Sequence, residues 1–137
     1  MTDISDTARA FFEACETGQG WQVCRQFCEA DAAFSAQAAP LAEVTTLAAY
    51  CDWMQGLMQM MPDGHYELRG FATDPGRATV LAYAVFKGTH TGVGGPPPTG
   101  RSTSSDYVYA MRFRDGRICH MSKIWNSGHA MAELGWA

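Results

Sequence analysis

The sequence predicts an α+β fold in which one antiparallel sheet carries helices on one face. Apolar residues recur at helical spacing up to residue 61, whereas strand-like runs separated by turn sequences follow from residue 65. A chain of 137 residues has room for one ordinary domain, so we expect a single domain over residues 1–137.

Three helices are expected in the first half. The helix over residues 4–15 has apolar side chains every three or four positions, namely Ile4, Ala8, Phe11, Phe12 and Cys15. A shorter helix fits residues 21–28, and a short strand fits residues 33–36. The third helix covers residues 44–61 and ends at Pro62, because a proline disfavours helical backbone at the residue before it.

Four strands are expected in the second half, over residues 65–73, 79–91, 103–114 and 117–126. The first two are joined by Asp74-Pro75-Gly76-Arg77 and the last two by Asp115-Gly116, both typical of hairpin turns. Residues 92–100 contain too much glycine and proline for a strand and are expected to form a loop.

The hairpin turns also predict which side chains share a face of the sheet. A two-residue turn at Asp115-Gly116 pairs Arg114 with Arg117. The more apolar face, here called the inner face, is expected to pack on the helices. It is predicted to carry Tyr66, Leu68, Leu81, Tyr83, Val85, Tyr107, Tyr109, Met111, Phe113, Ile118 and Ile124, with His120, Ser122 and Asn126 among its polar members. A β-bulge in any strand would invert part of this assignment.

The opposite, outer face is expected to mix charged groups with large apolar groups. Phe86, Val108, Met121 and Trp125 are assigned to it, together with Asp106, Arg112 and Lys123. Such a surface is typical of a protein interface, so we expect a homodimer formed through the outer face.

Composition excludes several classes of partner. The net charge is −4 and the ten Lys and Arg residues are scattered, which argues against binding of nucleic acid. No apolar run approaches the length needed to cross a membrane, and residues 1–10 lack the pattern of a secretory signal. We therefore expect a cytoplasmic protein that does not bind membranes.

The five cysteines are expected to be reduced and buried in the core. Cys24 and Cys28 share a helix face, but no second pair of ligands with suitable spacing accompanies them. We therefore predict no metal site. No cofactor is expected either.

Several motifs together resemble the SnoaL-like polyketide cyclase family of the nuclear-transport-factor-2-like superfamily. They are FKGTHTG at residues 86–92, PPTGR at 97–101, RFRDGRI at 112–118, AELGW at 132–136 and, more loosely, FCEADAAF at 27–34. The resemblance implies a SnoaL-like domain with the cystatin-like cone fold, in which a curved antiparallel sheet packs on three N-terminal helices. It also implies a pocket for a small apolar organic molecule between the sheet and the helices.

One position departs from the family pattern. SnoaL-like cyclases carry a catalytic Asp near the end of the last strand, where this sequence has Asn126. An amide cannot transfer a proton at neutral pH, although it can orient a carbonyl group or an oxyanion by hydrogen bonding.

The candidate catalytic residues are accordingly His120 and Asn126. His120 is the one residue assigned to the inner face that titrates near neutral pH, and its alternative role is that of a hydrogen-bonded core histidine. Because the two residues lie about 20 Å apart along one strand, they cannot both touch the same reacting atom. A carboxylate from the helical layer, Asp31 or Asp52, is the alternative base. The candidate ligand-binding residues are Tyr50, Met54, Tyr83, Tyr107, Tyr109 and Ser122.

Three functions remain open from the sequence. The first is a cofactor-independent cyclase, isomerase or dehydratase that acts by proton transfer on an apolar organic substrate. The second is a small-ligand-binding protein without catalysis, and the third is a protein-interaction module on the same fold. A shared fold does not decide between them.

Overall fold

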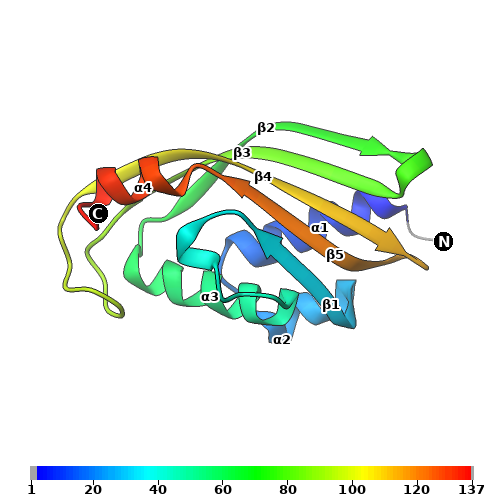
Figure 1. Cartoon of the computed structure of the whole chain (residues 1–137), viewed down its shortest axis with the longest axis horizontal. Coiled ribbons are helices and arrows are strands. Elements are labelled where there is room, and N and C mark those ends of the chain that lie inside the picture. The colour runs from blue at the N-terminus through cyan, green and yellow to red at the C-terminus, as the bar shows by residue number, and fades with distance from the viewer. Residues whose placement is uncertain (1–2, 137) are drawn as a thin grey trace.

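The computed structural model describes residues 3–136, which form helices packed on and beside one five-stranded sheet (Figure 1). In chain order the elements are α1 (Ile4–Glu16), α2 (Trp21–Cys24), β1 (Cys28–Ala36), α3 (Leu47–Met60), β2 (His65–Asp74), β3 (Thr79–Thr89), β4 (Ser102–Arg114), β5 (Arg117–Trp125) and α4 (Ser127–Leu134). The α+β class expected from the sequence is confirmed.

The sheet is curved, and its strand order is β1-β5-β4-β3-β2. The β2–β3, β3–β4 and β4–β5 pairs are antiparallel, but β1 runs parallel to β5. The sheet is therefore mixed rather than wholly antiparallel. Helices α1, α2 and α3 cover the concave inner face, and α4 lies across one end of the sheet (Figure 1).

Four elements differ from the expectation, and of these α3 differs least, since it begins at Leu47 rather than at residue 44. The second helix ends at Cys24 and continues as a 3₁₀ turn, so β1 begins at Cys28 rather than at residue 33. The helix α4 was not predicted at all. It is short and begins with a glycine at its second position, but Asn126 caps it by accepting a hydrogen bond from the backbone N–H of His129 at 3.2 Å.

The β4–β5 hairpin has the predicted turn but not the predicted register beyond it. Arg114 pairs with Arg117 as expected, and Asp115 and Gly116 both have positive φ, as a type I′ turn requires. A bulge follows, because Phe113 pairs with Ile118 whereas Arg112 pairs with His120, which leaves Cys119 as an extra residue.

The bulge inverts the rest of β5. Met121, Lys123 and Trp125 face the helices, and His120, Ser122 and Ile124 face outwards, so the sequence-based assignment of these six residues was wrong.

The assignment of β3 was also inverted. The loop between β2 and β3 holds four residues, Pro75 to Ala78, because Asp74 pairs with Thr79. Tyr83 therefore lies on the outer face with 42% of its surface exposed, as does Leu81 with 43%. The inner positions of β3 are taken by Val80, Ala82, Ala84 and Phe86, all of them buried. A second bulge at Arg69 in β2 keeps Tyr66 and Leu68 on the inner face as predicted.

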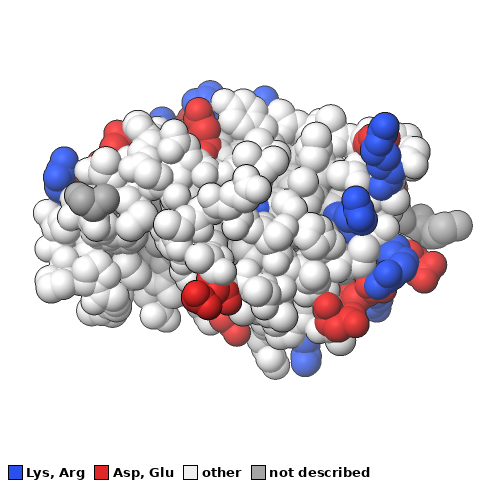
Figure 2. All heavy atoms as spheres, in the orientation of Figure 1, with Lys and Arg blue, Asp and Glu red and all other residues white. Residues whose placement is uncertain are grey.

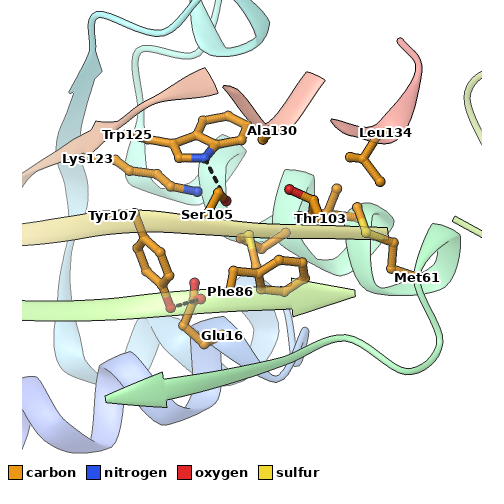
Figure 3. A pocket seen from close by; sticks show the side chains of 12 residues that line it. Glu16, Met61, Phe86, Thr103, Ser105, Tyr107, Lys123, Trp125, Ala130 and Leu134 are labelled. Atoms are coloured by element: carbon orange, nitrogen blue, oxygen red, sulfur yellow. Dashed lines mark hydrogen bonds between the residues drawn. The ribbon is translucent and has the colours of Figure 1, made fainter. Parts of the chain in front are cut away.

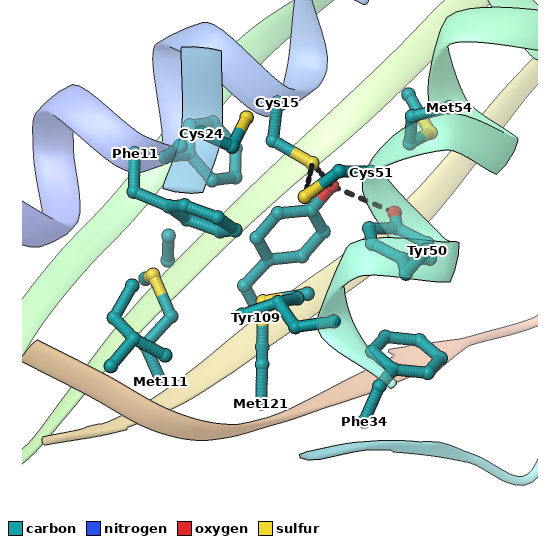
Figure 4. Packing of buried hydrophobic residues seen from close by; sticks show 14 of the residues in the cluster. Phe11, Cys15, Cys24, Phe34, Tyr50, Cys51, Met54, Tyr109, Met111 and Met121 are labelled. Carbon is teal, nitrogen blue, oxygen red and sulfur yellow. Dashed lines mark hydrogen bonds between the residues drawn. The ribbon is translucent and has the colours of Figure 1, made fainter. Parts of the chain in front are cut away.

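The core lies between the inner face and α1 and α3 (Figure 4). Aromatic rings dominate it: Phe34 of β1 stacks on Tyr50 of α3 at 4.4 Å between ring centroids, and Phe12 meets Tyr109 edge-on at 5.0 Å. Ring pairs at such separations add attraction beyond the burial of their surface.

The loop over residues 91–100 is anchored by His90, which is fully buried. Its Nδ1 accepts hydrogen bonds from the indole N–H of Trp136 at 3.0 Å and from the backbone N–H of Thr99 at 3.3 Å. At Gly92 an added Cβ would lie 2.0 Å from the backbone oxygen of Gln59 in α3, so only glycine fits this approach. The loop is thereby held against the C-terminal end of α3.

Surface charge is sparse on the face shown in Figure 2. Lys, Arg, Asp and Glu side chains gather there mainly at the end of the molecule that carries the β2–β3 and β4–β5 turns. Within residues 3–136, no helix has both the length and the apolar character that a membrane span requires.

We predict that all five cysteines are reduced and bind no metal. Four are buried, and Cys15, Cys24 and Cys51 place their Sγ atoms within 4.8 Å of one another in the core. Intact mass with and without reductant should agree, and a chelator should leave the melting temperature unchanged. Unfolding on addition of chelator would instead reveal a structural metal at this cluster.

Candidate functional site

A narrow pocket lies between the inner face and the helices, at the end of the sheet that α4 closes (Figure 3). Its walls are mostly apolar, with a few polar groups pointing inwards. It is lined by Glu16, Met54, Leu57, Met61, Phe86, Thr103, Ser105, Tyr107, Lys123, Trp125, Ala130 and Leu134.

The pocket has little free space. The space between its walls is about 350 Å³ out to the mouth, but only about 20 Å³ admits the centre of a water-sized molecule. That is room for about one water. Met54 and Leu57 of α3, with Met61 just after its end, form one wall. The flexible thioethers of the two methionines can shift to admit a larger apolar ligand.

The end of α4 is tied to the rim of the pocket. The carboxylate Oε1 of Glu133 accepts hydrogen bonds from the Thr103 hydroxyl and from the backbone N–H of Ser104, both at 2.9 Å. Deeper in the pocket, the indole N–H of Trp125 donates to the Ser105 hydroxyl at 3.3 Å. These bonds satisfy most of the polar groups on the β4 side, so they are not free to react.

Glu16 is a charged residue placed in the core. It is the last residue of α1 and lies one turn after Phe12, so it shares the helix face that packs on the sheet. Only 2% of its surface is exposed. A carboxyl group at such a position needs hydrogen-bond partners.

Two tyrosines supply those partners, and a third bonds one of the two. The hydroxyl of Tyr107 donates to Glu16 Oε1, and that of Tyr109 donates to Glu16 Oε2. Since a hydroxyl carries one proton, Tyr50, whose oxygen lies 2.7 Å from that of Tyr109, donates in turn to Tyr109. A hydrogen-bonded chain thus runs from α3 through β4 to the carboxylate on α1.

Lys123 is the second charged residue of the pocket. The bulge at Cys119 turns it inwards, and 6% of its surface is exposed. Its Nζ lies near four aromatic ring centroids, at 4.5 Å from Trp125, 5.2 Å from Tyr50, 5.3 Å from Tyr107 and 5.4 Å from Trp53. Figure 3 shows Glu16 at the hydroxyl end of Tyr107 and Lys123 beside the Tyr107 ring.

Burial shifts the pKa values of Glu16 and Lys123 in opposite directions. It raises the pKa of Glu16, an effect opposed by Lys123 and by the tyrosine hydroxyls. It lowers the pKa of Lys123 to about 8, an effect opposed by the negative charge of Glu16. The two groups are thereby brought closer in proton affinity, as groups that exchange protons with a substrate near neutral pH must be.

The sequence-predicted residues are only partly brought together. Met54 and Tyr107 line the pocket, and Tyr50 and Tyr109 belong to the hydrogen-bonded chain behind Glu16. These four lie around one site.

The other four candidates lie elsewhere. His120 is on the outer face, where its Nε2 is 3.2 Å from the Ser35 hydroxyl, and Ser122 bonds the same hydroxyl at 2.9 Å. Tyr83 is exposed on the outer face, and the Asn126 side chain caps α4. None of these residues lines the pocket.

The alternative carboxylates Asp31 and Asp52 are both exposed, and Asp52 accepts a hydrogen bond from the backbone N–H of Trp21 at 3.0 Å. Sequence reasoning missed Glu16 and Lys123. For Glu16 a signal was present, because a carboxylate four residues after Phe12 continues the apolar stripe of the helix. For Lys123 the bulge that turns it inwards leaves no comparable signal.

Comparison with known proteins gives the chain a family context. The family model described as SnoaL-like domain matches residues 8–121. IdmH from Streptomyces antibioticus, a candidate polyketide cyclase, has a similar crystal structure, with 26% identity, a TM-score of 0.74 and coverage of 98% of this chain and 99% of IdmH. None of the curated proteins matches.

Two further crystal structures show likeness of fold alone. A candidate SnoaL-like polyketide cyclase from Jannaschia sp. CCS1 is 16% identical, with a TM-score of 0.79 over 98% of this chain and 92% of that one. An NTF2-like protein from Burkholderia thailandensis E264 is 14% identical, with a TM-score of 0.78 over 98% of each chain.

We predict that the free energy of unfolding of the unmutated chain, relative to that of Lys123→Met, rises with pH. Between the folded-state pKa of about 8 and the usual pKa of 10.5, the unfolded chain binds more protons at Lys123 than the folded chain does. The stability of the unmutated chain relative to Lys123→Met should therefore rise by about 3 kcal/mol from pH 8 to pH 10.5.

Urea unfolding of both proteins under reducing conditions at stepped pH measures this difference, in which the cysteines and tyrosines common to both proteins cancel. Lys87→Met is the matched control, because Lys87 is partly exposed and paired with Glu67 at 3.1 Å. If the difference in unfolding free energy between the unmutated chain and Lys123→Met did not change with pH, the lowered pKa of Lys123 would be contradicted.

Proposed function

Because the chain belongs to the SnoaL-like domain family, we propose that it is a cofactor-free enzyme of the cyclase type that acts on a small apolar organic molecule carrying carbonyl groups. Glu16 is its proton-transfer group, and the Lys123 amino group lies where a substrate carbonyl would bind. The name of IdmH, a candidate polyketide cyclase, supports the reaction class. The free cysteines favour a reducing compartment, so we place the enzyme in the cytoplasm.

One observation carries this proposal: a carboxyl group with 2% exposure is held by two tyrosine hydroxyls at the wall of an apolar pocket. Burying a carboxyl group costs free energy unless it is compensated, so such groups cluster at functional sites. Glu16 also offers the proton-transfer chemistry that the amide of Asn126 cannot perform.

The chemistry follows from the arrangement. The Glu16 carboxylate removes a proton from the carbon next to a substrate carbonyl, and the C–H electrons form an enolate. The enolate carbon then attacks a second carbonyl of the same molecule, a C–C bond forms, and the alkoxide takes a proton back from Glu16. Apolar walls exclude water, which strengthens each of these electrostatic interactions.

Ligand binding without turnover is the second candidate. It is favoured by the small free space of the pocket, which in this structure admits little more than one water-sized molecule. The two candidates differ in whether Glu16 exchanges protons with a bound ketone.

We predict that the protein catalyses exchange of the α-protons of small linear ketones with deuterium from D₂O, as followed by proton NMR. Glu16→Gln should lower the exchange rate at least about a hundredfold, since a positioned acid–base group contributes roughly 10²–10⁴-fold. Tyr107→Phe should lower it less, because the second hydroxyl, on Tyr109, still holds the carboxylate.

Glu13→Gln is the matched control, because Glu13 lies one turn earlier on α1 and is exposed. Equal exchange rates for Glu16→Gln and Glu13→Gln would refute Glu16 as the base. Binding of the ketones, measured by calorimetry, with no exchange above the buffer rate would leave ligand binding as the function.

We also propose that the outer face forms a homodimer, with a corrected set of residues. Phe86, Met121 and Trp125 face the core and cannot contribute. Of the four exposed large hydrophobic residues in the part of the chain that the structure describes, three lie on this face, Leu81, Tyr83 and Ile124, and Val108 lies between them. An apolar patch of this kind favours burial against a second copy.

We predict a dimer in sedimentation at micromolar concentration, and Ile124→Glu, at a position 63% exposed, should shift it to monomer because it would bury a charge in the interface. Val93→Glu is the matched control, since Val93 is equally apolar but lies in the loop over residues 91–100. An unmutated chain that sediments as a monomer would contradict the assignment.

A further inference from the structure

We propose that Lys123 is a covalent catalyst, whose amino group forms an imine with a ketone or aldehyde carbonyl of the substrate. The proposal rests on the proposed function, because it concerns the same pocket and the same substrate class. It assigns the reacting carbonyl to Nζ and leaves the proton transfers to Glu16.

The surroundings of Nζ carry the argument. Within residues 3–136, no carboxylate oxygen lies within 4.0 Å of Nζ, and no hydrogen bond from it is present. Its near neighbours are instead four ring faces. A structural lysine is expected to form an ion pair, as Lys87 does with Glu67 at 3.1 Å. Lys123 keeps its nitrogen free and borders the pocket.

The environment also favours the reactive form of the amine. Only the neutral amine carries the lone pair that attacks a carbonyl, and desolvation in an apolar pocket is a known way to obtain it. Burial lowers the pKa of Lys123 to about 8, so a substantial fraction is neutral near pH 7.5.

The covalent step balances with the groups present. The Nζ lone pair attacks the carbonyl carbon, a C–N bond forms, and a proton moves from nitrogen to the former carbonyl oxygen. The resulting hydroxyl leaves as water after accepting a proton from the Glu16 carboxyl, and the nitrogen lone pair forms the C=N bond of a protonated imine. Amine, carbonyl and the Glu16 proton have then become a protonated imine and water, Glu16 is left as a carboxylate, and no oxidant or reductant is needed.

The imine would serve the proposed cyclisation directly. Once protonated it withdraws electrons more strongly than the original carbonyl, so the Glu16 carboxylate removes the neighbouring α-proton more easily. The C–H electrons form an enamine, whose carbon attacks a second carbonyl of the same molecule. A C–C bond forms, the protonated imine is restored, and the new alkoxide takes its proton from the Glu16 carboxyl. Hydrolysis by water then returns Lys123 and releases the product.

Reductive trapping tests the proposal. The protein is incubated with acetone, the smallest ketone, which enters once the Met54 and Met61 side chains shift, and sodium borohydride is added to reduce any imine to a stable amine. Peptide mapping by mass spectrometry should find one isopropyl group on Lys123, formed at least about tenfold faster than on Lys87. These are the two lysines of the chain, so Lys87 is an internal control. Equal or faster labelling of Lys87 would overturn the proposal.

Lys123→Arg supplies a second test that does not depend on trapping. Arginine keeps a cation that stacks on aromatic rings, but it forms no imine of this kind. The variant should lose α-proton exchange while circular dichroism and the melting temperature show a folded protein. Full exchange in Lys123→Arg would overturn the imine and leave Glu16 catalysis standing. Trapping at Lys123 together with unchanged exchange in Glu16→Gln would support the imine and refute Glu16 as the proton-transfer group.

The pH dependence of kcat/KM shows whether Lys123 acts as a neutral amine or as a charged ammonium group. A nucleophilic amine requires the neutral form, so kcat/KM should rise with pH as Lys123 loses its proton, up to about pH 8. A profile that falls through the same range would mean that the charged form acts, and it would overturn the proposal.

Discussion

The extra residue at Cys119 decides which side chains of β5 meet the helices. Side chains on a strand alternate between faces, so one inserted residue inverts every position after it. Before the bulge Ile118 is in the core, and after it Met121, Lys123 and Trp125 take the inner positions. In a regular hairpin Lys123 would point to solvent, and the pocket would have no amino group.

The site depends equally on a carboxylate whose burial is unfavourable by itself. Glu16 and Lys123 do not form a close ion pair. Their mutual attraction therefore does not remove the free-energy cost of burying both groups. The tyrosine hydroxyls offset part of this cost for Glu16, at about 1.5–3 kcal/mol for each hydrogen bond to a charged group. Apolar side chains at the two positions would give a more stable core, which is typical of positions retained for function rather than for stability.

Much of the fold could be read from the sequence, because its signals are local. Helical spacing identifies α1 and α3, and the Asp115-Gly116 turn identifies the β4–β5 hairpin and its first residue pair. The motifs of the second half indicated the SnoaL-like family, which the family model confirms.

The site was harder to predict, because it depends on register over a long distance. A turn specifies the pairing only until the first bulge. Gly70 stands beside the bulge at Arg69, but no glycine or proline lies next to Cys119 to mark the bulge in β5. A hairpin without the bulge predicts His120 on the inner face and Lys123 on the outer face, the reverse of what the structure has. The helix α4 was missed for a different reason, since Asn126 was read as a catalytic position although asparagine is also a preferred helix N-cap.

The aromatic rings around Lys123 also give the protein a built-in optical reporter. Trp53 and Trp125 meet edge-on at 6.1 Å between centroids, and both lie within 5.5 Å of the lysine nitrogen. Indole emission is sensitive to nearby charge and to water, and Trp125 lines the pocket. Loss of the ammonium charge, covalent attachment at Nζ or entry of a ligand would each alter the environment of the same two indoles. Intrinsic fluorescence can thus follow events at this site in real time, without a label that would itself occupy so narrow a space.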